Sequence, residues 1–351
     1  MDDKQDIIDY FDKGSEFVKQ QTKRQKKLKD YEIDCGKRGI YNTKNRLNEL
    51  TGKEWTFFIN SVLETDFVKN EEEFELWKFL QESVISTKYT TSGPDSYAHN
   101  LRKIHPSPKP PQLMRDIIAF FTKKNGWILD PFMGVGGTLL GSSLLEGRNA
   151  VGIELEQKYL DIYKKVCLQT KLKEQVSINE DSRNILEIES LKGKNFDLIL
   201  TDPPYSDMLS KKRTGGDRKD KGSFTKDDRD LGNIPYNEFF PEFRKIIERA
   251  IFYLKDKGYL VIFCKDLQPT RNHHFMLHAD IVNELIKIQD LYFKGYKIWY
   301  DKTINLYPYG YPFSYVSNQL HQYILIFRKE LTEKQKEITK KQSSNKSRDK
   351  A

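Results

Sequence analysis

The sequence predicts an α/β domain whose mainly parallel sheet is covered by helices on both faces. Between residues 105 and 205, short apolar runs of strand length alternate with longer segments of helical periodicity, a pattern typical of parallel sheets. The alternation resumes at Tyr236 and ends in two strands that could be antiparallel neighbours. A chain of 351 residues suggests about two domains. We therefore expect a mainly helical region over 1–104, the α/β domain over 105–328, and a disordered basic tail over 329–351.

The elements of the α/β domain follow from this alternation in chain order. Helical periodicity predicts helices at Gln112–Phe121, Thr138–Glu146, Gln157–Thr170, Tyr236–Leu254 and Ala279–Asp290. Apolar runs of strand length predict strands at Trp127–Leu129, Ala150–Ile153, Val176–Ile178, Phe196–Leu200, Tyr259–Cys264, Tyr296–Tyr300 and Tyr323–Phe327. Residues 206–232 break the pattern, because they are polar, basic and glycine-containing without periodicity. We expect a long mobile loop there.

The region ahead of this domain carries two helical patterns and much of the positive charge. Lys13–Lys29 holds seven Lys or Arg and one Glu, which predicts a basic helix or simply a solvated charged face. Glu71–Leu80 has apolar residues at the spacing of an amphipathic helix. The net charge of +8 favours a polyanionic partner, most simply nucleic acid, although a lysine-rich surface explains it equally well.

Composition argues against a disordered, membrane-spanning, secreted or disulfide-rich protein. Apolar residues make up 37% of the chain and charged residues 31%, which is polar but sufficient for a folded core. No apolar run approaches the ~20 residues of a membrane helix, and the acidic start of the chain lacks the apolar segment of a signal peptide. Cys35, Cys167 and Cys264 are too few and too far apart for a disulfide framework or a Cys-x-x-Cys zinc site. We expect a cytoplasmic protein.

A glycine-containing loop follows the first strand of the domain and leads into a helix. Asp130–Thr138 reads Asp-Pro-Phe-Met-Gly-Val-Gly-Gly-Thr, and its glycines let the backbone approach a ligand closely. The spacing departs from the dinucleotide motif Gly-x-Gly-x-x-Gly, because Leu139 occupies the third glycine position. It also departs from a P-loop, because Leu139-Leu140 stands where that motif needs Gly-Lys. The loop therefore predicts a ligand site without a phosphate cradle.

Two acidic residues at the ends of the next strands complete a candidate cofactor site. Glu154 ends the second strand, where a carboxylate can accept both hydroxyls of a ribose. Asp181 lies just past the third strand, where it could accept a hydrogen bond from an adenine amino group. Ribose and adenine acceptors without a phosphate site indicate a nucleoside cofactor, and S-adenosylmethionine is the obvious one. The alternative is a set of unrelated surface acids beside a structural glycine turn.

The fourth strand ends in Asp202-Pro203-Pro204-Tyr205, at the same edge of the sheet. Two consecutive prolines fix φ and stiffen the turn, which would hold Asp202 and Tyr205 in place. The Asp202 carboxylate and the Pro203 carbonyl could bind the two hydrogens of an exocyclic amino group, turning its lone pair towards a methyl donor. Tyr205 could stack on a base that has left the duplex. The alternative is a rigid strand-end turn with a solvated aspartate.

These motifs, in this order from about His105 to Phe327, resemble the S-adenosylmethionine-dependent DNA amino-methyltransferases, which make N6-methyladenine or N4-methylcytosine. The resemblance implies a Rossmann-like, seven-stranded mixed sheet whose last strand is antiparallel. It implies catalysis by Asp202–Tyr205, ribose binding by Glu154 and adenine binding by Asp181. It assigns further cofactor contacts to the loop and to the segment before it: Lys109, Pro110, Asp130, Pro131, Phe132, Gly134, Gly136 and Thr138.

The motif order is nearest to the γ arrangement of that family, with two departures. The γ arrangement more often has Asn at the position of Asp202, and it usually carries a large recognition domain after the last strand. Target recognition is therefore expected mainly from residues 1–104, where Asn45–Trp55 is similar to a segment of one branch, or from the loop 206–232. The segment 307–322 and a second subunit are further candidates. The candidate DNA contacts are the basic residues of the loop: Lys211, Lys212, Arg213, Arg218 and Lys219.

The resemblance favours adenine N6 over cytosine N4, because Asp at position 202 is more typical of the adenine enzymes. Double-stranded DNA is the expected partner, with a restriction nuclease or a second subunit as a further candidate and no membrane. Two rival functions stay open: an RNA base methyltransferase and a catalytically silent DNA-binding subunit. A metal site at His274 and His278 would lack a third ligand, so no metal is expected.

Overall fold

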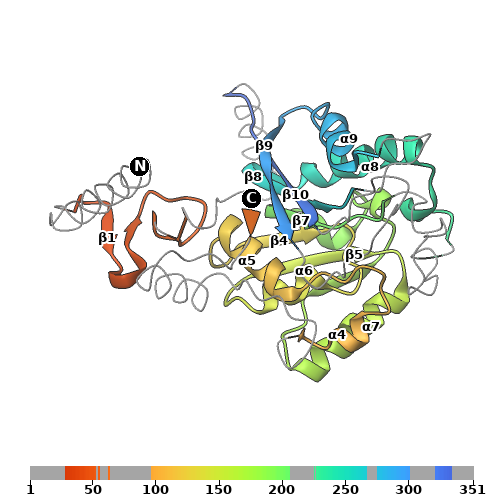
Figure 1. Ribbon diagram of the computed structural model, residues 1–351, viewed down its shortest axis with the longest axis horizontal. Helices are drawn as coiled ribbons and strands as arrows, with labels where there is room; N and C mark the ends of the chain where they lie inside the picture. The colour runs from red at the N-terminus through yellow and green to blue at the C-terminus, as the bar shows by residue number, and fades with distance from the viewer. Residues whose placement is uncertain are drawn as a thin grey trace, which may run out of the picture.

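The computed structural model describes residues 28–52, 54–55, 62–63, 96–205, 225, 227–266, 275–300 and 321–333. Its centre is one eight-stranded sheet with the order β3-β9-β10-β8-β7-β4-β5-β6 (Figure 1). In chain order the strands are β3 (Val62–Leu63), β4 (Trp127–Asp130), β5 (Asn149–Glu154), β6 (Val176–Asn179), β7 (Phe196–Thr201), β8 (Leu254–Cys264), β9 (Leu291–Tyr300) and β10 (His321–Lys329). The helices are α4 (His99–Arg102), α5 (Pro111–Phe121), α6 (Gly137–Ser143), α7 (Gln157–Thr170), α8 (Tyr236–Phe252) and α9 (Leu277–Leu285).

Alternate residues of the central strands pack into two separate cores, one on each face of the sheet. Leu198 and Leu200 of β7 belong to the core that α5, α6 and α7 cover. Ile199, between them, belongs to the core that α8 and α9 cover. Because successive strand side chains point to opposite faces, a strand that is apolar at nearly every position must be covered on both. The predicted doubly covered α/β sheet is confirmed.

The direction of the strands also agrees with the prediction. β10 runs antiparallel to both of its neighbours, β8 and β9, whereas the other described pairs of this sheet are parallel. β4 to β10 are therefore the seven-stranded mixed sheet that the resemblance implies, and β3 adds a two-residue strand at the edge beside β9. The strand order reverses between β4 and β7, the point at which open α/β sheets bind ligands.

Most predicted elements end within a few residues of the observed ones, and α7 has the predicted bounds. α9 is displaced towards the N-terminus. It begins before the predicted Ala279 because the carboxylate of Asp266 accepts the backbone N–H of His278, at 3.1 Å, in the first turn. It ends well before the predicted Asp290, which has a φ of 65°. A left-handed residue of this kind is typical of the turn after a helix rather than of its interior.

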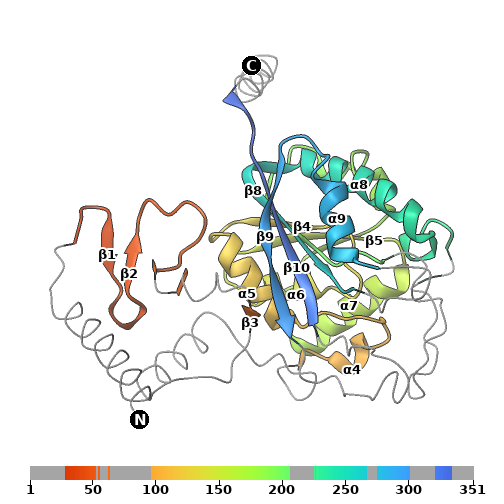
Figure 2. The ribbon, with the colours of Figure 1, turned by 45° about the horizontal axis from the view of Figure 1, so that its top comes forward.

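Residues 28–52 contain an antiparallel hairpin of β1 (Glu32–Asp34) and β2 (Ile40–Asn42), so the expectation of a mainly helical region is wrong for this stretch. The connection contains Gly36 and Gly39, whose φ values of 64° and 95° favour glycine. With strands of three residues each, the hairpin has no apolar run long enough to be recognised in the sequence. Figure 2 shows the hairpin beside the sheet domain, on the side of α5.

The segment after the hairpin attaches to the far end of α5. The side chain of Asn48 donates a hydrogen bond of 2.6 Å to the carbonyl of Phe120. Because α5 begins beside Lys109 and rises about 1.5 Å per residue, this attachment lies roughly one helix length from the predicted cofactor residues. Residues 28–52 are thus remote from the predicted site, whereas Arg102, also ahead of the α/β domain, donates a hydrogen bond of 2.9 Å to the carbonyl of Lys109. The helices expected over 13–29 and 71–80 fall essentially outside the described residues.

Candidate active site

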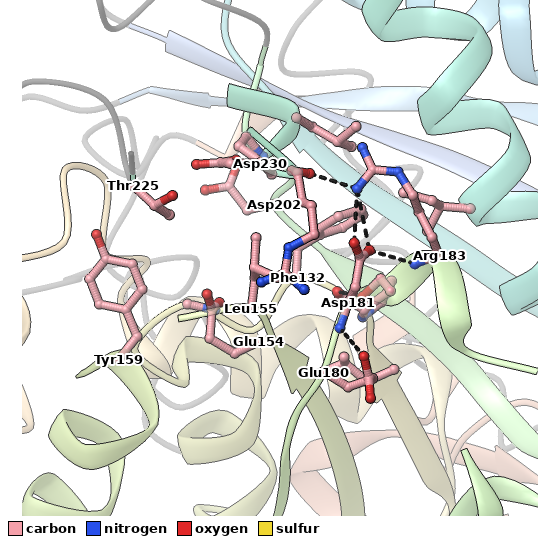
Figure 3. Close-up of a pocket in the computed structure, with 18 of the residues that line it drawn as sticks. Phe132, Glu154, Leu155, Tyr159, Glu180, Asp181, Arg183, Asp202, Thr225 and Asp230 are labelled. Carbon is pink, nitrogen blue, oxygen red and sulfur yellow. Dashed lines mark hydrogen bonds and ion pairs between the residues drawn. The ribbon is translucent and has the colours of Figure 1, made fainter. Parts of the chain in front are cut away.

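The carboxyl ends of β4 to β7 border a cavity that is partly open to solvent, with about 580 Å³ of empty space when the open solvent is included. A smaller cavity of about 300 Å³ shares His105, Phe132, Gly134 and Asp202 with it. Figure 3 labels ten residues that line the larger cavity: Phe132, Glu154, Leu155, Tyr159, Glu180, Asp181, Arg183, Asp202, Thr225 and Asp230. Five of the ten are carboxylates, so the cavity suits a ligand with positive charge and hydrogen-bond donors.

The two central glycines of the loop after β4 have different surroundings. Gly134 lines both cavities, and a Cβ at this position would lie 2.9 Å from Nε2 of His105. Gly136 lines neither described cavity. It has a φ of 78°, and a Cβ there would lie 2.2 Å from the ring of Tyr163. Gly134 can therefore contact a ligand in the cavity, whereas Gly136 lets the loop pack against Tyr163 of α7.

Gly136→Ala is expected to destabilise the protein more than Gly193→Ala does. Both glycines have nearly equal left-handed φ values, 78° and 77°, but a Cβ at Gly193 would meet nothing within 4 Å. Gly193→Ala should cost about 1–2 kcal/mol of unfolding free energy for the backbone alone. Gly136→Ala should cost about 1–3 kcal/mol more, because Tyr163 must move. Denaturant unfolding of both variants measures the difference, and equal losses would show that the contact with Tyr163 is not limiting.

Glu154 is tied to the glycine loop by its own carboxylate. Its Oε2 accepts the backbone N–H of Gly134 at 2.8 Å, and its Oε1 accepts that of Glu156 at 2.9 Å. Burial raises the pKa of Glu154 to about 7, although these two hydrogen bonds oppose the shift. The predicted ribose acid therefore lies in the cavity, beside the loop, and is close to half-ionised at neutral pH.

Asp181 also lines the larger cavity, and Arg183 neutralises it. Its Oδ1 accepts the backbone N–H of Arg183 at 2.9 Å, and its Oδ2 lies 3.0 Å from the guanidinium of the same residue. That guanidinium also donates a hydrogen bond of 2.6 Å to the carbonyl of Arg229. Arg183 thus connects the end of β6 to residues 227–233, at the C-terminal end of the predicted loop. These residues are anchored over the cavity, so the expectation of a mobile loop does not extend to them.

Asp130 lies beneath the glycine loop and lines only the smaller cavity. Its carboxylate accepts a hydrogen bond of 2.7 Å from the hydroxyl of Thr201 and one of 3.0 Å from the backbone N–H of Phe132. Burial raises the pKa of Asp130 to about 6. Thr138, which lines the same cavity, donates from its hydroxyl to the carbonyl of Leu200 at 3.4 Å. In the described structure these residues hold the loop against β7.

The carboxylate of Asp202 is engaged at both oxygens. Its Oδ2 forms an ion pair with Nζ of Lys109, and its Oδ1 accepts a hydrogen bond from the hydroxyl of Tyr205. The Tyr205 hydroxyl also lies 2.7 Å from the carbonyl of Phe263, so its single hydrogen has two alternative acceptors. Burial raises the pKa of Tyr205 well above its usual value, which keeps the hydroxyl protonated. Asp202 and Pro204 line the larger cavity.

The structure thus brings most of the predicted site residues together. Pro131, Phe132, Gly134, Glu154 and Asp181 join Asp202 and Pro204 around the larger cavity, and Lys109, Asp130 and Thr138 line the smaller one. Pro110, Gly136, Pro203 and Tyr205 border the site without lining either described cavity. The ring of Tyr205, predicted to stack on a base, packs against the core in this structure.

Several lining residues were not predicted as site residues from the sequence, among them Tyr159, Glu180, Arg183 and Asp230. Arg183 stands two residues after the predicted Asp181, a spacing at which an ion pair could have been anticipated. His105 lies at the start of the stretch that resembles the DNA amino-methyltransferases. Its ring makes an edge-on contact with the ring of Tyr159, and the two ring centroids are 4.9 Å apart. Burial lowers the pKa of His105 to about 3, so its imidazole is neutral.

Several predictions concern residues outside the described part of the chain. They include the candidate DNA contacts Lys211, Lys212, Arg213, Arg218 and Lys219. Within the described ranges, no three His, Cys, Asp or Glu side chains are arranged to hold a metal ion. The Nδ1 atom of His278 instead lies 2.7 Å from Asp266. Among the described helices, none has the length and apolar character needed to cross a bilayer.

Comparison with known protein families identifies the family of the chain. The family N6_N4_Mtase, described as DNA methylase, matches residues 2–165 and 196–351. The chain belongs to this family of DNA methylases. The resemblance to the DNA amino-methyltransferases is thereby confirmed, and S-adenosylmethionine is the methyl donor that goes with the family. The choice between the N6 and N4 reactions does not follow from membership.

Curated relatives match shorter stretches of the chain. The type II methyltransferase M.HinfI of Haemophilus influenzae is 41% identical over 70 residues, which are 20% of this chain and 19% of the relative. The putative methyltransferase MJ0046 of Methanocaldococcus jannaschii is 32% identical over 129 residues, which are 36% of this chain and 47% of the relative. The tRNA (guanine(10)-N2)-dimethyltransferase of Pyrococcus abyssi is 34% identical over 96 residues, which are 27% of this chain and 28% of the relative. The chain thus spans less than half the length of each of these relatives.

Solved structures resemble the chain at low sequence identity. TrmN from Thermus thermophilus has 13% identity and a TM-score of 0.43, with 66% of this chain and 53% of that chain covered. The putative methyltransferase SMU.1697c from Streptococcus mutans has 12% identity and a TM-score of 0.37, with 63% of this chain and 98% of that chain covered.

Proposed function

We propose that the protein transfers a methyl group from S-adenosylmethionine to the N6 amino group of adenine in double-stranded DNA. Membership of the DNA methylase family supports amino methylation of DNA. The observation that carries the proposal is the position of Asp202-Pro203-Pro204-Tyr205 at the carboxyl end of β7, where Asp202 and Pro204 line the cavity. The preference for adenine rests on Asp at position 202, and cytosine N4 is the alternative target of the same site.

The donor groups of S-adenosylmethionine fit the acceptors that line the cavity. The cofactor carries a sulfonium cation, an ammonium group, two ribose hydroxyls and an adenine amino group, and five carboxylates line the cavity. Glu154 would accept the ribose hydroxyls and Asp181 the adenine amino group. Gly134, with no side chain, leaves the loop backbone accessible to the ligand. Lys109, at the smaller cavity, would be within the reach of the cofactor carboxylate.

The chain's own part in the reaction is to present the amino nitrogen. S-adenosylmethionine supplies a methyl group that its sulfonium makes electrophilic. Asp202 Oδ1 and the Pro203 carbonyl would bind the two amino hydrogens and turn the nitrogen lone pair towards that methyl group. Tyr205 can release Oδ1 because its hydroxyl has a second acceptor in the Phe263 carbonyl. Catalysis would then depend on positioning and on preorganised charge at the amino group.

RNA is the second candidate substrate. It is favoured by the match to the tRNA (guanine(10)-N2)-dimethyltransferase of Pyrococcus abyssi, which covers 27% of this chain. The family match covers far more of the chain and describes a DNA methylase, so DNA is the preferred proposal. The loop lysines and arginines from 211 to 219 would contact its phosphates. A restriction nuclease or a second subunit would be a further partner, and the cytoplasm the compartment.

Single-molecule sequencing of DNA from cells that express the chain tests the proposal. N6-methyladenine in a defined sequence motif, absent from cells with an empty vector, is the expected result. N4-methylcytosine would keep the mechanism and overturn the choice of base. Unmodified DNA together with a methylated base in RNA would favour the second candidate.

Cofactor affinity is expected to rise with pH because Glu154 must ionise to accept ribose hydroxyls. With a pKa of about 7, the ionised fraction of Glu154 grows about tenfold between pH 6 and pH 8, and the affinity should follow it before levelling off. Asp130 has a pKa of about 6, so its ionisation would change the affinity only at lower pH. Calorimetric titration with S-adenosylhomocysteine measures the profile. Glu154→Gln should flatten it above pH 7, and an unchanged slope in that variant would exclude Glu154 as the titrating group.

A further inference from the structure

Asp230 borders the larger cavity with one carboxylate oxygen unpaired. Its Oδ1 accepts the backbone N–H of Gly232 at 2.8 Å and so caps the short helix Leu231–Asn233. Its Oδ2 is buried and has no hydrogen-bond partner within the part of the chain that the structure describes. The residue as a whole is 5% exposed. The backbone N–H groups of Gly232 and Thr225 both lower the pKa of Asp230 against the effect of burial, but neither gives Oδ2 a full hydrogen bond. Leaving a buried carboxylate oxygen without one is costly, so this atom points to a further donor.

Asp181 offers a matched comparison within the same cavity. It too caps a short helix through Oδ1, but its Oδ2 is paired with the guanidinium of Arg183 at 3.0 Å. The arginine next to Asp230 in the sequence is already used, because the Arg229 guanidinium donates to Asp227 at 2.6 Å. Capping alone therefore does not explain a carboxylate at position 230, since one oxygen suffices for the cap and the other remains unpaired.

The unpaired oxygen belongs to the part of the cavity that holds Glu154. The pKa of Glu154 is raised by burial first and then, among charges, by Asp230. Asp230 also contributes to the raised pKa of Tyr159, which lines the same cavity. Figure 3 shows Asp230 above and Glu154 below the open centre of the cavity, with Thr225 and Tyr159 to one side. Two acidic side chains thus face a common space with no cation described between them.

We propose that Asp230 is a second ribose-binding carboxylate, whose Oδ2 accepts a hydrogen bond from a ribose hydroxyl of the bound nucleoside cofactor. The assignment rests on the proposed function, in which Glu154 binds the same ribose. Each oxygen of Glu154 already accepts one backbone N–H, from Gly134 or Glu156. A second acceptor on the opposite side lets the two hydroxyls of the ribose donate to different carboxylates. The cofactor then supplies a donor to Oδ2 of Asp230, which has no hydrogen-bond partner among the described residues.

Calorimetric titration of the full chain with two probes tests the assignment. S-adenosylhomocysteine contains ribose, adenine and an amino acid, whereas 5′-methylthioadenosine keeps the ribose and adenine only. In Asp230→Asn the amide oxygen can still cap Gly232 while the charged oxygen is lost. We expect both probes to bind about tenfold more weakly to this variant. Asp227→Asn, at a partly buried neighbour paired with Arg229, is the control and should change both affinities by less than about twofold.

Each outcome decides for or against the assignment. Equal affinities in wild type and Asp230→Asn would overturn it, and so would a loss confined to S-adenosylhomocysteine, which would place Asp230 at the amino-acid end. A wild-type chain that binds neither probe would overturn the proposed function itself, which is a distinguishable result. If Asp230→Asn does not fold, Asp230→Ser replaces it, because serine also caps helices and has no carboxylate. That variant should show the same parallel loss with both probes.

Discussion

Asp202→Ala is expected to lower the turnover of DNA methylation by at least about a thousandfold while changing the affinity for S-adenosylhomocysteine by less than about threefold. The carboxylate lines the cavity, and among the described residues its hydrogen-bonding and ion-pair partners are Lys109 and Tyr205. In the proposed reaction it orients the amino group, which is needed in the transition state more than for cofactor binding. Transfer of a labelled methyl group to DNA measures turnover, and calorimetry measures the affinity.

Asp202→Asn separates loss of the acceptor from loss of the local structure. Asparagine keeps one carbonyl oxygen at this position, and the γ arrangement of the family commonly uses it. This variant should therefore retain activity well above that of Asp202→Ala. Turnover of Asp202→Ala equal to that of the wild type would overturn the assignment of the catalytic motif. Parallel loss of cofactor affinity in both variants would instead show that the whole cavity depends on Asp202.

The acidic residues of the site could be predicted because topology places them. Glu154, Asp181 and Asp202 each follow a strand of a parallel sheet, and the carboxyl ends of such strands meet at one edge. Knowing the strands was therefore enough to know that these side chains converge. The strands themselves were recognisable because burial on both faces makes them apolar at nearly every position.

The contacts between distant segments could not be predicted in this way. Lys109 and Asp202 are 93 positions apart, and no local pattern links them. Asp230 follows a polar stretch without periodicity, and only the fold brings it opposite Glu154. The hairpin of residues 28–52 was missed for another reason: its strands are three residues long, too short to show an alternating pattern.

Lys109→Met is expected to reduce both stability and activity. Nζ of Lys109 pairs with Asp202, and the two side chains are 4% and 13% exposed. Removing one partner of a buried pair leaves a charge without compensation and costs about 3–5 kcal/mol of unfolding free energy. The matched control is Lys158→Met, which breaks an exposed pair with Glu156 at 3.4 Å and should cost less than about 1 kcal/mol. Denaturant unfolding compares the two variants.

The activity of Lys109→Met should show which partner Lys109 serves. Without the Lys109 ammonium, Asp202 loses the cation that pairs with its Oδ2. Turnover should therefore fall, while the affinity for S-adenosylhomocysteine should stay within about threefold of the wild type. Arg102 holds the Lys109 carbonyl at 2.9 Å, so the backbone should stay in place. Weaker cofactor binding with unchanged stability and turnover would show instead that Lys109 serves the cofactor, the role that the family resemblance gives it.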